Sequence, residues 1–189
     1  APDGTFESMV QRVYRQLTEA GIHAPVTIAT SISQAESIRS QLGYSIDMVL
    51  EPERRNTYPA IALSCAYLAS EKQVPLDETV IVLPVDPYAE QAYFETLRRM
   101  DDAVQAGAAE LILMGIQPTY ASEKYGYIVP VDHCSSEPIG VARFTEKPSE
   151  RDAEELISKG AVWNGGVFAF RLGWLLDTVR KQMNFTGYP

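Results

Sequence analysis

The chain has 189 residues, of which 46% are hydrophobic, and its 25 acidic and 16 basic side chains give a formal charge of -9. A chain of this length can bury one sizeable core, and its negative charge repels the phosphate backbone of a nucleic acid. No apolar run reaches the ~18 to 20 residues that span a bilayer, so we expect a globular protein that binds neither nucleic acid nor membrane.

Helices and strands are predicted to alternate along most of the chain. The first helix runs from Phe6 to Leu17, with apolar residues at helical spacing, and Gly21 ends its periodic pattern. In chain order there follow a strand at 26–30, a helix from an N-cap at Ser33 to Leu42 closed by Gly43, a strand at 46–50, a helix at 59–70, a strand at 79–84, a helix at 89–106 and a strand at 110–116. Such alternation indicates an α/β fold with a mostly parallel sheet flanked by helices.

The pattern changes after Pro118. Strands are predicted at 126–131 and 139–145, and the polar, Ser-rich stretch between them indicates a hairpin. The remaining predicted elements are a helix from Ser149 with Glu154, Glu155 and Lys159 facing solvent, a strand at 162–170 and a last helix from Trp174. No repeat or linker divides the sequence, so we predict a single domain over residues 1–189.

The cysteines and histidines do not form a recognisable reactive or metal-binding motif. Cys65 and Cys134 are far apart and have neither a zinc-ligand nor a disulfide spacing, which fits reduced thiols in the cytoplasm. His23 and His133 each stand apart from any Ser or Cys motif, and we expect both at the surface. Covalent acyl or thiol chemistry is therefore not expected.

The densest polar cluster, Glu51 to Thr57, lies between a predicted strand and a predicted helix. In open α/β sheets ligands bind at this kind of junction, because the carboxyl ends of strands and the amino ends of helices meet there. Asn56 or Thr57 would cap the helix, and Pro59 suits its first turn. The alternative is a charged loop with an ordinary helix cap.

Asp86 follows the apolar strand that ends near Val85. A carboxylate at the carboxyl end of a strand can hold Mg²⁺, which favours oxygen ligands and bridges protein carboxylates to substrate phosphates. An aspartate that simply forms a turn after the strand is the alternative.

Two further segments carry polar groups at the ends or interruptions of strands. In Glu146-Lys147-Pro148 the lysine could meet a phosphate and the glutamate could accept hydrogen bonds from sugar hydroxyls, although a surface ion pair would have the same sequence. In Trp163-Asn-Gly-Gly-Val-Phe168 the glycines fit either a close ligand approach or a β-bulge.

Taken in order, these segments and Tyr125-Gly-Tyr-Ile128 resemble the successive motifs of mannose-1-phosphate guanylyltransferases, within the sugar-nucleotide pyrophosphorylase superfamily. The quoted motifs are Glu51-Pro-x-x-Arg-Asn-Thr-x-Pro-Ala-Ile-Ala62, Val82-Leu-Pro-Val-Asp86, Tyr125-Gly-Tyr-Ile128, Phe144-Thr-Glu-Lys-Pro148 and Trp163-Asn-Gly-Gly-Val-Phe168. The resemblance implies a Rossmann-like three-layer sandwich with a mostly parallel mixed sheet. It also implies a reaction in which mannose 1-phosphate attacks the α-phosphorus of GTP with Mg²⁺, giving GDP-mannose and pyrophosphate.

The resemblance assigns roles to particular residues. Those expected to line the guanosine pocket are Glu51, Asn56, Thr57, Pro59 and Ala60. Those expected to contact mannose 1-phosphate are Gly126, Glu146, Lys147 and Asn164, whereas Asp86 would hold the metal ion. Asp86 and Lys147 are thus the expected catalytic groups, acting by positioning and charge neutralisation. The resemblance further implies a homodimer.

The sequence departs from the family pattern at Pro87, where the family usually has histidine, and at Gly165, where it often has serine. The family's opening strand and its Gly-rich GGxGxRLWPxS segment are expected to be missing from this chain, as is the C-terminal part of the domain, so that the chain would bind triphosphate poorly. Two alternatives stay open at this point: another sugar-1-phosphate nucleotidyltransferase, and a non-catalytic regulatory homologue that keeps the sugar-nucleotide pocket.

Overall fold

A computed structural model describes residues 6–86, 88–131 and 137–183. The chain divides into two compact units. The first unit comprises Ala1–Val80, Pro84–Arg98 and Phe170–Pro189, and the second comprises Ile81–Leu83 and Arg99–Ala169. Within the described residues, no helix is long and apolar enough to cross a membrane. The single domain expected from the sequence stays a prediction.

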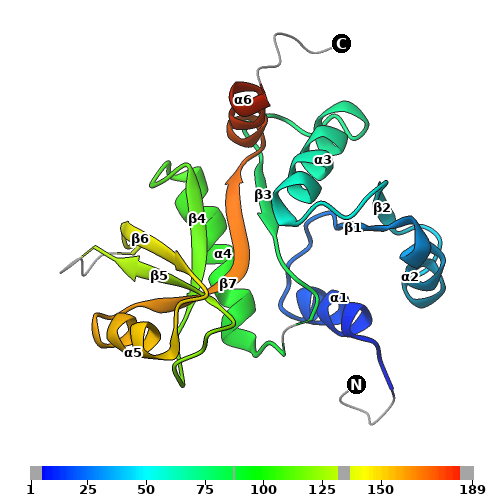
Figure 1. The fold of residues 1–189 in the computed structure, drawn as a ribbon. Coiled ribbons are helices and arrows are strands. Elements are labelled where there is room, and N and C mark those ends of the chain that lie inside the picture. The colour runs from blue at the N-terminus through cyan, green and yellow to red at the C-terminus, as the bar shows by residue number, and fades with distance from the viewer. Residues whose placement is uncertain (1–5, 87, 132–136, 184–189) are drawn as a thin grey trace. The chain divides into compact units, whose positions relative to one another are not determined.

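The first unit combines a two-stranded sheet with helices. Its complete elements are α1 (Met9–Glu19), β1 (Thr27–Ser31), a 3-10 turn (Ile32–Gln34), α2 (Ala35–Leu42), β2 (Asp47–Glu51), α3 (Thr57–Ser70) and α6 (Leu172–Met183), all labelled in Figure 1 except the turn. Strands β1 and β2 pair in parallel, from Thr27 opposite Asp47 to Ser31 opposite Glu51. The predicted order of these elements is confirmed, with ends that differ by a few residues.

Local capping signals explain several of the helix ends. Ser8 and Gln11 form a capping box at the start of α1, and Gly43 ends α2 with a φ of 94° that favours glycine. The predicted N-cap at Ser33 is wrong, because residues 32–34 form the 3-10 turn and α2 begins only after Gln34. A 3-10 turn before a helix uses tighter i to i+3 hydrogen bonds, so the α-helical hydrogen-bond pattern begins a few residues later.

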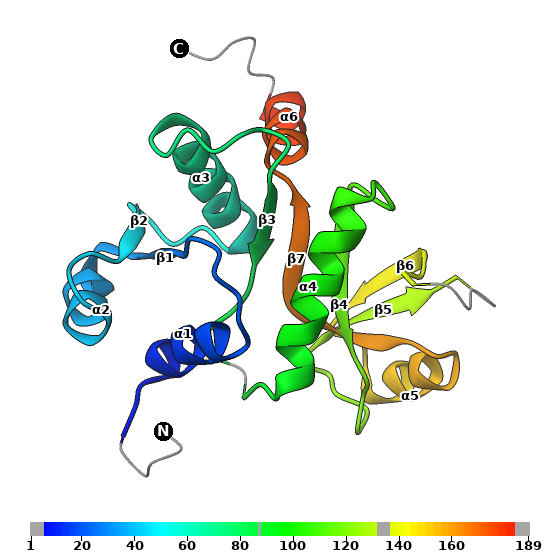
Figure 2. The same cartoon turned by 180° about the vertical axis from the view of Figure 1, so that it is seen from behind.

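The larger sheet has the strand order β3-β7-β5-β6, and β4 also pairs with β7. Its strands are β3 (Thr79–Val82), β4 (Leu111–Ile116), β5 (Gly126–Pro130), β6 (Val141–Glu146) and β7 (Val162–Arg171), and the helices that accompany them are α4 (Gln91–Gln105) and α5 (Glu150–Ser158). Figure 2 shows these strands from the side opposite to Figure 1. Strand β5 is antiparallel to both β6 and β7, whereas β1 and β2 of the two-stranded sheet are parallel, so the protein contains both kinds of strand pair.

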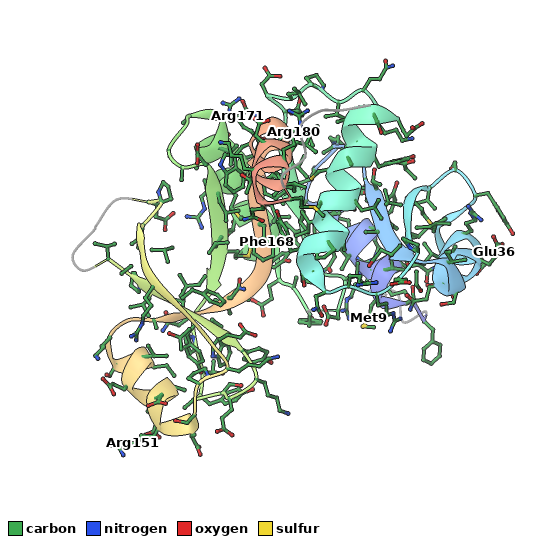
Figure 3. All side chains as sticks on the ribbon, turned by 45° about the horizontal axis from the view of Figure 1, so that its top comes forward. Met9, Glu36, Arg151, Phe168, Arg171 and Arg180 are labelled. Carbon is green, nitrogen blue, oxygen red and sulfur yellow. The ribbon has the colours of Figure 1, made fainter. Side chains whose placement is uncertain are left out.

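The predicted hairpin is confirmed, because β5 and β6 are consecutive and antiparallel. His133 and Cys134 of the connecting loop lie outside the described residues, whereas His23 is exposed as expected. Ser149 caps α5, accepting a hydrogen bond from the Asp152 N–H at 3.2 Å. The exposed side of α5 carries the expected charged residues, and Figure 3 shows its Arg151 pointing away from the strands.

Each unit has its own buried side chains. In the first unit they include Val13, Leu17, Val49, Cys65, Phe94, Leu97, Phe170, Leu172, Leu175 and Leu176. In the second unit they include Met100, Val104, Ile112, Met114, Tyr127, Ala153, Leu156, Ala161 and Val167. Burying apolar side chains of this kind stabilises each unit by roughly 1.5 to 3 kcal/mol per large residue before the entropy cost of folding is subtracted.

A polar brace holds β2 in place within the first unit. Asp47 accepts hydrogen bonds from Thr27 Oγ1 at 2.6 Å and Tyr67 OH at 2.8 Å, and its carboxylate lies 2.7 Å from Lys72 Nζ. Burial alone would raise the pKa of Asp47, but the hydrogen bonds from Lys72, Thr27 and Tyr67 outweigh it and lower the pKa. The brace ties β1, β2 and α3 together and so fixes the strand that ends at Glu51.

Candidate functional site

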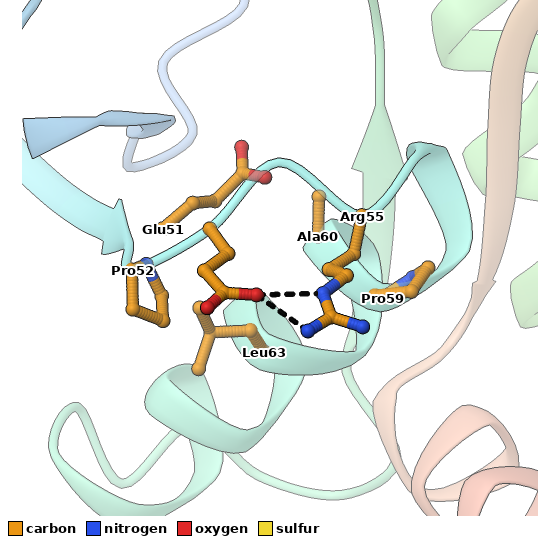
Figure 4. Close-up of a pocket in the computed structure, with 7 residues that line it drawn as sticks. Glu51, Pro52, Arg55, Pro59, Ala60 and Leu63 are labelled. Atoms are coloured by element: carbon orange, nitrogen blue, oxygen red, sulfur yellow. Dashed lines mark hydrogen bonds and ion pairs between the residues drawn. The ribbon is translucent and has the colours of Figure 1, made fainter.

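The junction between β2 and α3 forms a pocket of about 380 Å³ in the first unit. Its lining residues, drawn in Figure 4, are Glu51, Pro52, Glu53, Arg55, Pro59, Ala60 and Leu63. Three of the five residues predicted to bind a nucleotide, Glu51, Pro59 and Ala60, are therefore together around one cavity. A pocket at the carboxyl end of a strand and the amino end of a helix matches the ligand position of open α/β sheets.

Asn56 and Thr57 lie at the edge of this junction and do not line the pocket. Asn56 occupies the N-cap position of α3, as predicted, but its side chain makes no capping hydrogen bond. Its φ of 69° lies in the left-handed region, which is uncommon for a residue other than glycine. The first backbone N–H groups of α3 therefore have no partner in the Asn56 side chain.

Four further residues line the pocket without having been assigned a binding role from the sequence: Pro52, Glu53 and Arg55, which lie within the predicted polar cluster Glu51 to Thr57, and Leu63, which lies outside it. Arg55 Nε donates to Glu53 Oε2 at 2.9 Å, so two of the lining residues form an exposed ion pair. Leu63 lies four residues after Pro59 on α3, and this helical spacing was a signal that could have found it. The ion pair had no comparable signal, because it depends on side-chain rotamers.

Asp86 also belongs to the first unit and is exposed. Strand β3 ends at Val82, two residues earlier than the predicted strand at 79–84. Asp86 therefore lies four residues beyond the strand, whereas the sequence predicted it close to the strand's end. Burial, and then the negative charge of Asp86, raise the pKa of Tyr93, in the first turn of α4, to about 12.

Among the described residues, no group of three His, Cys, Asp or Glu could hold a metal ion by itself. A lone exposed carboxylate still fits Mg²⁺, which keeps several waters and takes its other ligands from phosphates. Asp86 therefore fits a metal that arrives with a nucleotide better than a permanently bound one.

Three of the residues predicted to bind sugar phosphate share one face of the β6-β5-β7 part of the sheet, in the second unit. Gly126 lies opposite Glu146, and Ile128 lies opposite both Phe144 and Val162. Side chains alternate along a strand, so Asn164, two residues after Val162, points to this same face. We call the surface carrying Gly126, Phe144, Glu146 and Asn164 the polar sheet face.

The opposite face of the same strands is packed against α5. Tyr127 is fully buried there in a cluster with Ala153 and Leu156, and Trp163 packs against this cluster. The Tyr127 hydroxyl donates to the Ser122 carbonyl at 3.1 Å and accepts from the Ser122 N–H at 2.8 Å, which fixes the loop before Gly126. With one face of the hairpin covered by α5, the register places Gly126, Phe144 and Glu146 on the other face, where the Phe144 and Glu146 side chains are exposed and Ile128 is buried.

Gly126 is buried on the polar sheet face beneath two side chains. A Cβ placed on it would lie 2.5 Å from Phe144 Cζ and 2.8 Å from Glu146 Oε2. The absent side chain therefore makes room for the Phe144 ring and the Glu146 carboxylate to lie across the backbone. Gly126 therefore contributes to the polar sheet face by having no side chain, and it contributes no polar side-chain group of its own.

Lys147 follows β6 in a left-handed backbone conformation, with φ at 44°. Its N–H donates to the Tyr125 carbonyl at 3.2 Å, and its Nζ lies 3.7 Å from Glu146 Oε1. Both side chains are more than half exposed, so this ion pair contributes little to stability and leaves the ammonium group available to a phosphate. Among the described residues other than glycine, only Asn56, Gln73 and Lys147 have positive φ, and two of these three are predicted site residues.

The glycines of the Trp163–Phe168 segment have structural reasons. Gly166 has a φ of 69°, and its N–H donates to Asn164 Oδ1 at 3.1 Å. A Cβ on Gly165 would lie 3.1 Å from the Met114 carbonyl and 3.0 Å from Ile116 Cδ1, so this glycine allows β4 to pack closely on β7. The side-chain oxygen of Asn164 thus holds the turn at Gly166.

A family model described as nucleotidyl transferase matches residues 2–187. The chain belongs to the nucleotidyl transferase family. Among curated members, this nucleotidyl transferase is similar to the alginate biosynthesis protein AlgA of Pseudomonas aeruginosa, with 31% identity over 185 residues that cover 93% of the chain and 37% of AlgA. It is also similar to the mannose-1-phosphate guanylyltransferase RfbM of Salmonella typhimurium, with 31% identity over 179 residues, covering 92% of the chain and 37% of RfbM.

Solved structures share the fold of this nucleotidyl transferase. A protein from Thermus thermophilus described as mannose-1-phosphate geranyltransferase superposes with a TM-score of 0.77 at 28% identity, covering 96% of this chain and 56% of the other. A protein from Helicobacter pylori described as mannose-6-phosphate isomerase gives a TM-score of 0.76 at 26% identity, covering 93% and 66% of the two chains. These findings confirm the predicted family resemblance and the α/β fold class.

Proposed function

We propose that the protein of which this chain is part transfers the guanylyl group of GTP to mannose 1-phosphate, forming GDP-mannose and pyrophosphate. The observation that carries the proposal is the position of Gly126, Glu146 and Asn164 on one face of the sheet, with Lys147 next to Glu146. Relatives with the name mannose-1-phosphate guanylyltransferase support the choice of substrates. The chain spans only 37% of the length of RfbM, so we propose this activity for the whole protein.

The nucleotide subsite is assigned to the β2–α3 junction. Glu51 at the end of β2 would accept hydrogen bonds from the N–H groups of a guanine, and Pro59 and Ala60 would pack against the base. Asn56 and Thr57 present the amino end of α3, where free backbone N–H groups and the helix dipole favour an anionic or polar ligand. Together these groups would hold the nucleoside without covalent chemistry.

The sugar-phosphate subsite is assigned to the polar sheet face. Glu146 and Asn164 would hydrogen-bond to mannose hydroxyls, and Lys147 would bind the phosphate. Phe144, which is 45% exposed, offers an apolar surface beside Glu146 for the carbon face of the sugar ring. A sugar that cannot satisfy the polar groups leaves them unpaired, which gives the subsite its selectivity.

The reaction needs no nucleophile from the protein. A phosphate oxygen of mannose 1-phosphate forms a bond to the α-phosphorus of GTP, while the bond from that phosphorus to the pyrophosphate oxygen breaks and pyrophosphate leaves with the electron pair. Lys147 holds the attacking phosphate in position and offsets its charge. Asp86 would hold Mg²⁺, which supplies further charge neutralisation on the triphosphate. These substrates also fit the cytoplasmic location expected from the sequence.

Pyrophosphate release from mannose 1-phosphate with GTP, ATP, UTP or dTTP tests the proposal, using this chain and the same chain extended by the Gly-rich segment of the family. Release with GTP alone is expected. Release with another nucleotide only would assign a different nucleotidyltransferase, and silence from both proteins would favour the non-catalytic homologue. Asp86→Asn should abolish release, whereas Glu90→Gln, an exposed acid in the same loop, should not. The homodimer implied by the family resemblance is tested by measuring the molar mass of the protein with light scattering after size-exclusion chromatography.

A further inference from the structure

The loop that carries Asp86 is held by helix α1, which is distant in sequence. Residues 83–86 and 88–90 form neither helix nor strand. Gln16 of α1 donates from its Nε2 to the Ala89 carbonyl at 2.8 Å, and the Ala89 side chain is buried at 6% exposure. The Arg12 guanidinium lies 5.6 Å from the centre of the Tyr88 ring. One turn of α1 therefore contacts two consecutive residues of the loop.

Buried polar atoms surround this attachment. Gln16 Oε1 and Tyr93 OH are buried and have no hydrogen-bond partner among the described residues. Burying such atoms without partners costs stability. The Gln16 amide that carries one of these atoms is bonded to Ala89, and Tyr93 lies in the first turn of α4, where the charge of Asp86 adds to burial in raising its pKa.

We propose that Gln16 is a positioning residue for Asp86. By fixing the Ala89 carbonyl, its side-chain amide limits the arrangements of a loop that has no regular secondary structure, and so holds the Asp86 carboxylate where it can meet a divalent cation bound to a nucleotide. The inference rests on the proposed role of Asp86 as the metal ligand. A single carboxylate binds such a cation weakly, which makes its affinity sensitive to how well the loop is held.

The sequence offers a matched control on the same helix. Gln11 donates from its Nε2 to the Gln41 carbonyl at 2.9 Å, which is the same kind of bond to a different segment, and it also completes the capping box with Ser8. Gln11→Met should therefore cost at least as much stability as Gln16→Met. Only Gln16→Met frees the loop of Asp86.

The experiment uses the chain extended by the Gly-rich segment of the family, titrates it with Mn²⁺ in the presence of GTP and follows paramagnetic broadening of the Asp86 backbone amide by NMR. Gln16→Met is expected to raise the Mn²⁺ concentration for half-broadening about three- to tenfold, the effect of losing one hydrogen bond, and Gln11→Met is expected to leave it unchanged. Amide shifts outside residues 84–93 and the α1 turn around Gln16 should match the wild type, which shows that the variant is folded.

The outcomes separate this inference from the proposed function. Equal midpoints for the wild type and Gln16→Met, with Asp86 broadened in both, would overturn the positioning role alone. Equal increases in Gln16→Met and Gln11→Met would overturn it too, since the effect would then follow general stability. Absence of broadening at Asp86 in the wild type would overturn the metal assignment itself, and the positioning role with it.

Discussion

Replacing Gly126 with alanine places a methyl group where two side chains already lie. The added Cβ would be 2.5 Å from Phe144 Cζ, 3.2 Å from Phe144 Cε2 and 2.8 Å from Glu146 Oε2, all well inside ordinary van der Waals contact. These atoms are the ends of flexible side chains, and the Phe144 ring is 45% exposed, so the side chains can move while the backbone stays. The stability cost should fall near the lower end of overpacking, at about 1 kcal/mol.

The functional cost should be larger. Relieving the contacts displaces the Glu146 carboxylate by about 1 Å, and misplacement of this size can reduce activity by about a hundredfold when the group positions a substrate. We expect the KM for mannose 1-phosphate to rise at least about tenfold and the KM for GTP to stay unchanged. Steady-state pyrophosphate release, varying one substrate at a time, gives both constants, and thermal unfolding gives the stability.

Gly140→Ala in the same hairpin is the control. A Cβ at Gly140 would meet Val131 Cγ2 at 3.3 Å, a contact that a small shift relieves, and no sugar-site residue is involved. An unchanged KM for mannose 1-phosphate in Gly126→Ala, or the same change in both variants, would refute the role given to Gly126. A loss of more than about 3 kcal/mol would refute the argument that the side chains yield first.

Three further predictions concern buried or braced groups. Tyr127→Phe leaves the N–H and carbonyl of buried Ser122 without their partner, and denaturant unfolding should show a loss of about 2 to 4 kcal/mol. The interactions that lower the pKa of Asp47 stabilise the fold at pH values above its ordinary pKa of 3.8, and this stability is lost as pH falls through the folded pKa. In Asp47→Asn, the free energy of unfolding should be lower at neutral pH and should change less with pH in this acid range. Burial raises the pKa of Cys65 to about 12, so peptide mass spectrometry should find it unalkylated by iodoacetamide at about pH 8 and alkylated only in denaturant.

Local signals in the sequence were sufficient for most of the fold. Gly43 and Ser149 mark the ends of their helices by backbone freedom and by capping, which depend only on neighbouring residues. The prediction of Ser33 as an N-cap was wrong because residues 32–34 form a 3-10 turn and the α-helix starts after it. Serine is compatible both with such a turn and with an N-cap position, so its presence does not distinguish them. The order of strands in the larger sheet depends on contacts between distant residues, which a single sequence does not contain.

The candidate site was predictable as residue types and not as geometry. The motifs gave Glu146 and Asn164, but their common face follows from the pairing of Gly126 with Glu146 and of Ile128 with Val162. A slip of one residue in either pair would have sent one of them to the α5 side. The support that Gln16 gives to Ala89 spans 73 residues of sequence and has no motif.

The left-handed residues Asn56 and Lys147 set a limit on how this protein can be engineered. Glycine at either position would relieve backbone strain of about 1 kcal/mol or more, so a selection for heat resistance alone would reward it. The same substitutions would remove the Asn56 side chain at the amino end of α3, beside the assigned nucleotide subsite, and the Lys147 ammonium group assigned to the phosphate. A library aimed at thermostability should therefore hold these two positions fixed, because the glycine that relieves backbone strain there also removes a side chain of the proposed binding sites.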